Sequence, residues 1–274
     1  TLPQDSRFDG LRAGGYSAGP AQSTIAEPLV PGGNIAVGTS TGDVFMGGVG
    51  TVTAICGTTV WAFGHPMGWE GKTSLSMHNA SAARVVPDST GVDGSYKQVS
   101  KIGQQIGTIT QDRFAAIRGE IGLDRSFPVT ATIRDNEGVI DVYNSRIPGQ
   151  NFSVLAAYTS VNAVVDSLDN VGTGTVRHAW KISYKLPGGQ AGVVSRSQVY
   201  AYSGILHNMI FADLVYDLDR LSSTDLADVE ITSVESTATL VNEDVLTYRV
   251  VGAQALVGST WANLDGRRLK AKRT

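Results

Sequence analysis

The stretch Val176-Arg-His-Ala-Trp-Lys-Ile-Ser-Tyr-Lys-Leu186 alternates apolar and polar side chains along its whole length. Successive side chains of a strand point to opposite faces of a sheet, so this pattern predicts a strand with one buried face. His178 falls on the apolar face, and we expect it to pack in the core. Pro187-Gly-Gly-Gln190 then predicts a tight turn into a second strand near Val193–Tyr202.

A helical pattern lies on each side of this predicted hairpin. Ser153 is placed to cap the first helix. The apolar positions at helical spacing are Ala157, Val161, Val164 and Leu168 in the first helix, and Ile205, Met209, Ala212 and Tyr216 in the second. Two further strands, Val229–Val234 and Val245–Ala253, close the chain. The segment 149–274 therefore predicts an α+β module with two helices.

The segment 34–148 contains several stretches whose residues favour β-strands. Its predicted strands, separated by glycine-containing turns, are Asn34–Thr39, Gly50–Cys56, Thr59–Phe63, Gln105–Thr110 and a hairpin of Val129–Arg134 with Val139–Tyr143. Residues between Gly64 and Tyr96 are predicted to be irregular. Residues 1–33 show no clear periodicity of apolar side chains, so we expect an extended segment that wraps around the rest of the chain. We therefore expect three parts, 1–33, 34–148 and 149–274, in a β-rich α+β fold whose front is all β.

Composition excludes several classes of protein. The 274 residues carry a formal net charge of −3, whereas nucleic-acid-binding domains usually present a basic face. No apolar run approaches the length of a membrane helix, so we expect no transmembrane segment. The single cysteine, Cys56, excludes an internal disulfide and a cysteine-based zinc site, and its apolar surroundings predict a buried thiol.

One histidine is held in a setting that suits catalysis. His65 follows a predicted strand and lies between Gly64 and Pro66. Glycine permits close approach of the backbone, and proline restricts the conformation of the residue before it. An imidazole that titrates near neutral pH on such a fixed turn is suited to act as a general base. The alternative interpretation is that His65 is a turn residue whose side chain only hydrogen-bonds to the backbone.

A series of short motifs surrounds this histidine in a fixed order. They are Pro31-Gly-Gly-Asn-Ile35, Thr41-Gly-Asp43, Gly50-Thr-Val-Thr53, Phe63-Gly-His-Pro66, Ser95-Tyr-Lys97, Ile106-Gly-Thr-Ile-Thr-Gln-Asp-Arg113 and Ile117-Arg-Gly119. The series resembles the SpoIVB-type S55 peptidase domain, especially its large envelope-associated bacterial members. The resemblance is dense over roughly residues 30–125.

The resemblance implies a serine endopeptidase whose barrel-like front is related to half of a chymotrypsin-like enzyme, with His65 as general base. The family's Ser-Gly-Ser-Pro motif occurs nowhere in these residues. We therefore expect the nucleophilic serine to come from outside this chain. Ser17 and Ser203 are the nearest local substitutes, and both lack the surrounding glycine frame that would build an oxyanion hole.

Asp112, in Gln111-Asp-Arg113, is the candidate third member of a catalytic triad that would orient His65. An ion pair with Arg113, or a role in capping a nearby loop, is the alternative. His78 is a candidate for a supporting role near His65. The acidic residues Asp213, Asp217 and Asp219 are predicted to lie on a solvated surface rather than to bind calcium. The sequence predicts neither a metal site nor a cofactor.

Two other functions remain open. The chain could be a non-catalytic binding or structural module of the bacterial envelope, or a hydrolase that uses Thr1 as an amino-terminal nucleophile. Composition suits an exported protein, so we expect the bacterial cell envelope or the extracellular space. The expected partner is a polypeptide, either a substrate or an upstream fragment of the same precursor.

Overall fold

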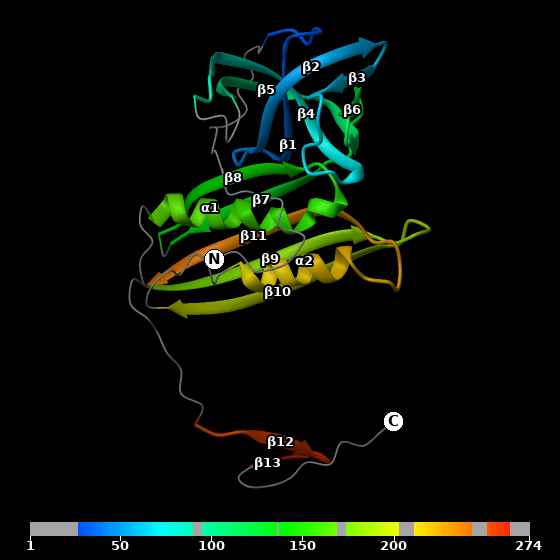
Figure 1. The fold of residues 1–274 in the computed structure, drawn as a ribbon. Coiled ribbons are helices and arrows are strands. Elements are labelled where there is room, and N and C mark those ends of the chain that lie inside the picture. The colour runs from blue at the N-terminus through cyan, green and yellow to red at the C-terminus, as the bar shows by residue number, and fades with distance from the viewer. Residues whose placement is uncertain are drawn as a thin grey trace.

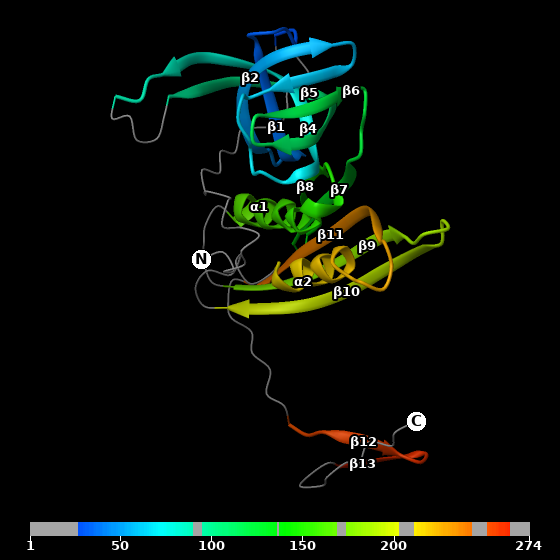
Figure 2. The ribbon, with the colours of Figure 1, turned by 45° about the vertical axis from the view of Figure 1, so that its right-hand side comes forward.

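The computed structural model describes residues 27–89, 95–135, 137–168, 174–202, 211–242 and 251–263. Strands dominate, and two α-helices accompany them, so the predicted β-rich α+β fold is confirmed. Figures 1 and 2 show two stacked parts, with a barrel-like set of strands above a sheet that carries both helices.

Six strands form the first part. They are β1 (Asn34–Gly42), β2 (Met46–Cys56), β3 (Thr59–Ala62), β4 (Gly71–Val86), β5 (Tyr96–Arg113) and β6 (Ala116–Ile121). Antiparallel pairing runs in the order β1–β2–β3–β6–β5–β4, and β4 pairs again with β1. The pairing therefore closes a ring, which agrees with the predicted barrel-like front. Its interior is filled by buried apolar side chains, among them Ile35, Val37, Leu75, Met77 and Ile109.

Strand β1 also connects the two parts. Its last residues, Thr41 and Gly42, pair with β8 (Val139–Ile147) of the second sheet. Asp43 strengthens this junction, because its backbone N–H donates to the Asn144 carbonyl at 2.9 Å and its carboxylate accepts from the Asn144 N–H at 2.6 Å. The Thr41-Gly-Asp43 motif is thus the joint between barrel and sheet.

The second sheet has the order β8–β7–β11–β9–β10. Its other strands are β7 (Phe127–Arg134), β9 (Gly174–Lys185), β10 (Ala191–Tyr202) and β11 (Glu230–Asn242). The predicted hairpin of β7 and β8 forms, but β7 pairs in parallel with β11 and not with a barrel strand. The change from one sheet to the other therefore lies before Phe127.

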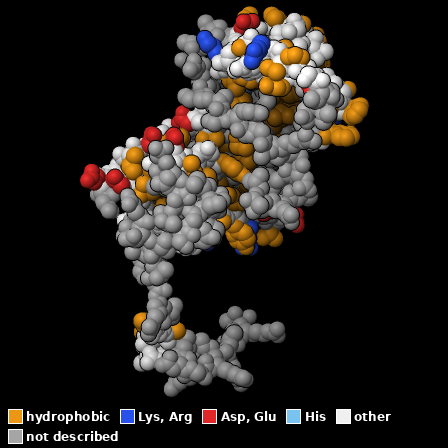
Figure 3. Space-filling view, turned by 60° about the vertical axis from the view of Figure 1, so that its left-hand side comes forward, with side chains coloured by type: hydrophobic (Ala, Val, Ile, Leu, Met, Phe, Trp, Pro, Cys, Tyr) orange, Lys and Arg blue, Asp and Glu red, His pale blue; other side chains and the backbone are white. Residues whose placement is uncertain are grey.

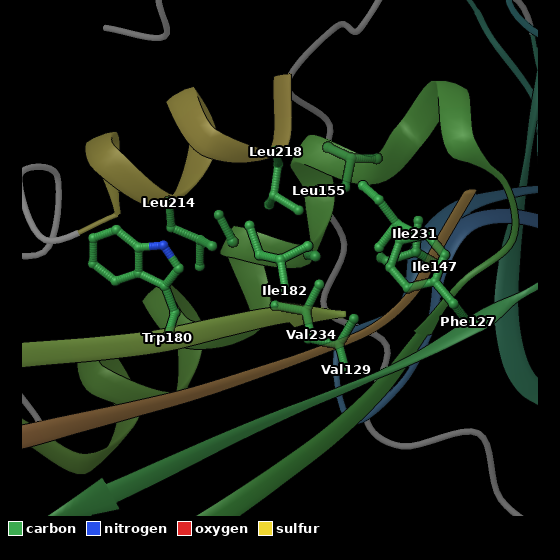
Figure 4. Close-up of a cluster of buried hydrophobic side chains, with 12 residues drawn as sticks. Phe127, Val129, Ile147, Leu155, Trp180, Ile182, Leu214, Leu218, Ile231 and Val234 are labelled. Carbon is green, nitrogen blue, oxygen red and sulfur yellow. The ribbon is translucent and has the colours of Figure 1, made fainter. Parts of the chain in front are cut away.

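Alternation in β9 was predicted correctly. His178 and Trp180 are buried together with Ile182, and β9 pairs with β10 along its whole length through the predicted turn. The short 3-10 helix η1 (Gln150–Leu155), α1 (Ala156–Leu168) and α2 (Ala212–Ser222) cover one face of the sheet. Figure 4 shows Leu214 and Leu218 of α2 directed toward Trp180 and Ile182.

Two details of the helices differ from the prediction. Ser153 lies inside η1, where its buried hydroxyl has no hydrogen-bond partner in the described part of the chain, so it does not cap α1. Helix α2 buries Leu214 and Leu218, whereas Ala212 and Tyr216 of the predicted stripe are exposed. The stripe was wrong in its described half, because Leu214 and Leu218 are the buried positions, and its first two members, Ile205 and Met209, lie outside the described residues.

The predicted irregular region from Gly64 to Tyr96 is also wrong in large part, because it contains the long strand β4. The extended segment predicted at 1–33 lies mostly outside the described residues, and so does most of the strand predicted at 245–253. A separate hairpin of β12 (Gln254–Val257) and β13 (Thr260–Asn263) pairs with no other strand among the described residues. On the face shown in Figure 3, hydrophobic side chains reach the surface in the barrel part.

Burial predicts a large stability difference between two leucines. We expect Leu214→Ala to lower the free energy of unfolding by about 2 to 5 kcal/mol, because it removes a fully buried side chain and leaves a cavity. Leu226→Ala is the matched control, since this side chain is 95% exposed, and we expect it to change stability by less than about 0.5 kcal/mol. Urea unfolding of both variants measures the difference. Equal effects would contradict the placement of α2.

Candidate functional site

His65 lies on the loop that joins β3 to β4, and its side chain is exposed. Its Nδ1 is 2.7 Å from the carbonyl oxygen of Pro66. A carbonyl only accepts hydrogen bonds, so Nδ1 carries the proton that it donates, and Nε2 of the neutral ring holds the lone pair. The side chain is exposed, and in this neutral tautomer Nε2 is the ring atom that accepts hydrogen bonds.

The backbone before His65 adopts a left-handed turn. Phe63 has φ of 73° and Gly64 has φ of 71°. Glycine adopts this region freely, whereas phenylalanine is strained in it. A Cβ atom on Gly64 would meet nothing within 4 Å. The glycine is therefore explained by its φ angle and not by the close backbone approach that the sequence suggested.

The Phe63 ring packs directly against Gly50, and this contact helps to stabilise the strained turn. A Cβ atom on Gly50 would come within 2.2 Å of the ring, so only glycine leaves room for it. The Phe63 N–H also donates to the Thr51 carbonyl at 2.8 Å, and the Phe63 and His65 ring centroids are 5.6 Å apart. The Gly50 and Phe63 motifs therefore form one unit that supports the imidazole.

Asp112 fixes the part of the loop that follows His65. Its side chain is fully buried at the end of β5. The carboxylate accepts hydrogen bonds from the backbone N–H groups of Met67 at 2.9 Å, Gly68 at 2.8 Å and Glu70 at 3.3 Å. Charged acceptors make stronger hydrogen bonds than neutral ones, so this single side chain determines the course of the loop.

These contacts differ from the one expected for Asp112, which was predicted to orient the imidazole. The hydrogen bonds of Asp112 go to loop amides, and Nδ1 of His65 bonds to Pro66. Arg113 bonds through its Nε to Gln111 at 2.9 Å. Asp112 is therefore linked to His65 indirectly, through the loop whose amides it binds.

Lys97 joins three of the sequence motifs at one point. Its ammonium donates to the Asn34 Oδ1 at 2.7 Å, the Gly50 carbonyl at 2.9 Å and the Thr51 Oγ1 at 2.7 Å. Burial lowers the pKa of Lys97. The lysine ties β5 to β1 and β2 next to the glycine that seats Phe63, so it supports the base of the His65 loop. Lys97 belongs to one of the sequence motifs, but the sequence did not indicate which groups its ammonium would bind.

His78 and His178 are both fully buried. The Nδ1 of His78 donates to the Gly103 carbonyl at 2.9 Å, and its ring meets Phe45 edge-on with centroids 5.8 Å apart. Burial is the main cause that lowers the pKa of His78, and main-chain hydrogen bonds oppose it in part. His78 is therefore buried against Phe45, on the face of β4 opposite to Met77, and does not belong to the exposed loop that carries His65. His178 is a core residue, as the sequence predicted.

The other candidates are accounted for as follows. Cys56 is exposed, so the prediction of a buried thiol is wrong. Asp213 and Asp217 both pair with Arg196, and Asp217 also accepts from the Trp180 Nε1 at 3.0 Å, so these two do not form a simple solvated surface. Ser17, Ser203 and Thr1 lie outside the described residues.

No cluster of three or more potential metal ligands occurs among the residues that the structure describes. Over the same residues, no helix is long and apolar enough to cross a membrane. A scan against protein-family models and a search of curated proteins found no match to this chain.

The geometry predicts that Asp112→Asn loosens the loop. The side-chain amide of asparagine would present an N–H group to at least one of the backbone N–H donors, so at least one hydrogen bond would be lost. A hydrogen bond to a charged acceptor is worth about 1.5 to 3 kcal/mol. We expect a loss of stability of that order, measured by urea unfolding. Hydrogen exchange should accelerate at the amides of Met67, Gly68 and Glu70. Asp225→Asn, on an exposed residue, is the control; unchanged exchange in Asp112→Asn would contradict the assignment.

Burial of His78 predicts a pH dependence of stability. The unfolded chain protonates this histidine near the ordinary pKa of 6.5, whereas the folded chain resists protonation until a lower pH. Its contribution is therefore fully present above pH 6.5 and is lost as the pH falls below that value toward the folded pKa. We expect His78→Gln to reduce the slope of unfolding free energy against pH in this window. An identical slope in both proteins would contradict this prediction.

Proposed function

We propose that this chain forms the histidine-bearing part of a serine endopeptidase of the S55 type, with His65 as general base. The observation that supports the proposal most is the exposed imidazole whose Nδ1 proton is donated to the Pro66 carbonyl, which leaves the Nε2 lone pair to accept a proton. The ordered motifs support it further, because four of them meet around this loop through Gly50, Phe63, Lys97 and Asp112.

In the proposed reaction, a serine supplied by polypeptide outside this chain attacks the carbonyl carbon of a peptide bond. Nε2 of His65 takes the hydroxyl proton as the new C–O bond forms and then gives that proton to the leaving amine as the C–N bond breaks. Water repeats the sequence and releases the acyl group, and the serine regains its proton. His65 alone accelerates acyl transfer little, because the nucleophile and the base act as a unit.

The partner of Nδ1 has a chemical consequence. A carbonyl oxygen fixes the same tautomer as the aspartate of a serine protease triad, but it carries no full negative charge with which to stabilise the imidazolium. Asp112 supplies rigidity instead, through the loop amides. We therefore expect the base to be well placed but less strongly activated than in a complete triad.

The test is reaction of the complete gene product with a fluorophosphonate probe, which labels only activated serines. We expect labelling at a serine outside residues 1–274 and a loss of at least about a thousandfold in the labelling rate in His65→Ala, since removal of the base disables the pair. Lys101→Ala is a control on an exposed side chain of the same barrel. Thermal unfolding should show that His65→Ala folds normally.

Other outcomes separate the alternatives. Labelling that does not depend on His65 would contradict its role as base. Absence of labelling, with intact folding, would favour a non-catalytic envelope module. Hydrolase activity that disappears when the amino group of Thr1 is acylated would favour the amino-terminal nucleophile.

A further inference from the structure

Two large aromatic side chains stand exposed beside the His65 loop. Trp69 is 66% exposed and Phe114 is 71% exposed. Their ring centroids are 5.6 Å apart with the planes inclined at 49°, so the two rings contact each other and form one apolar surface. Single exposed apolar residues are common on proteins, whereas two large exposed rings in contact form a candidate binding surface.

The same carboxylate that holds the His65 loop also joins the two aromatic residues. Trp69 lies between Gly68 and Glu70, whose amides both donate to Asp112. Phe114 follows Asp112 closely in the turn between β5 and β6. Gly71, the first residue of β4, pairs with Asp112 in the barrel. The rings and the imidazole are therefore presented by one connected piece of structure.

Trp69 occupies a strained backbone conformation, with φ of 60°. Bulky residues are rare in this left-handed region, and glycine would adopt it without strain. The side chain buries little surface in return, because two thirds of it remains exposed. Strain held in a residue that adds little to the core is characteristic of functional sites. The position is therefore better explained by binding than by folding.

We propose that Trp69 and Phe114 form a subsite that binds an apolar side chain of a polypeptide lying across His65. This inference rests on the proposed function, since it takes the polypeptide to be the substrate of the same loop. Aromatic side chains dominate the energetics of such contacts. An anionic membrane surface fits less well, because the residue after Trp69 is the exposed acid Glu70 and the chain carries a net charge of −3.

The experiment measures peptide binding in the absence of turnover. The chain carrying His65→Ala is titrated against a fluorescein-labelled hexapeptide of alanines with one central phenylalanine, and against the same peptide with serine at the centre, by fluorescence anisotropy. We expect the phenylalanine peptide to bind at least about tenfold more tightly. We expect Trp69→Gly and Phe114→Ala each to weaken its binding at least about tenfold.

Stability provides the second measurement. Glycine suits a φ of 60°, so Trp69→Gly should not lower the midpoint of thermal unfolding while it weakens binding. Trp261→Ala is the matched control, because this tryptophan is 65% exposed on β13, away from the loop, and its loss should leave binding unchanged.

Three results would overturn the proposal. The first is peptide binding that the Trp69 and Phe114 variants leave unchanged. The second is binding of phosphatidylcholine–phosphatidylserine vesicles, but not of either peptide, that Trp69→Gly abolishes. The third is self-association, seen by sedimentation, that depends on the rings in the absence of peptide binding. Aromatic-dependent peptide binding without His65-dependent serine labelling would support the subsite and reject only the proposed catalysis.

Discussion

Hydrogen bonding along both edges of β1 is the constraint on which the structure depends. This strand pairs with β2 and with β4, which closes the ring, and its last two residues continue into the second sheet through β8. Every side chain from Ile35 to Thr41 that projects from it is buried. Because one strand belongs to both parts, the barrel cannot shift relative to the sheet without breaking pairs in both.

The candidate site is built on the outside of that ring. Phe63 leaves β3 over Gly50 of β2, Asp112 of β5 holds the amides after His65, and Lys97 of β5 bonds to β1 and β2. These supports involve strands β1, β2 and β5, so the loop is positioned by several strands of the barrel. A rigid scaffold with an exposed loop is the usual arrangement of functional sites.

Particular elements show how far sequence patterns reach. The alternation of β9 was recognised because one face is buried and the other is not. Strand β4 was missed because many of its residues are small or polar and few large apolar side chains mark it. The apolar stripe assigned to α2 failed because Tyr216 is exposed, while Asp213 and Asp217 bind Arg196 of the neighbouring strand.

The sequence by itself determined the local features: the β-rich content, the hairpin turns, and a histidine held between Gly64 and Pro66 at the end of a strand. These follow from side-chain periodicity and from backbone preferences, which act over a few residues. Only the tertiary structure decided that Asp112 binds amides of the loop and that Lys97 gathers three motifs. It also decided that β7 and β8 belong to the second sheet. The hydrogen bonds of Lys97 and Asp112 join residues as much as 63 positions apart, and no local pattern records which distant donor meets which acceptor.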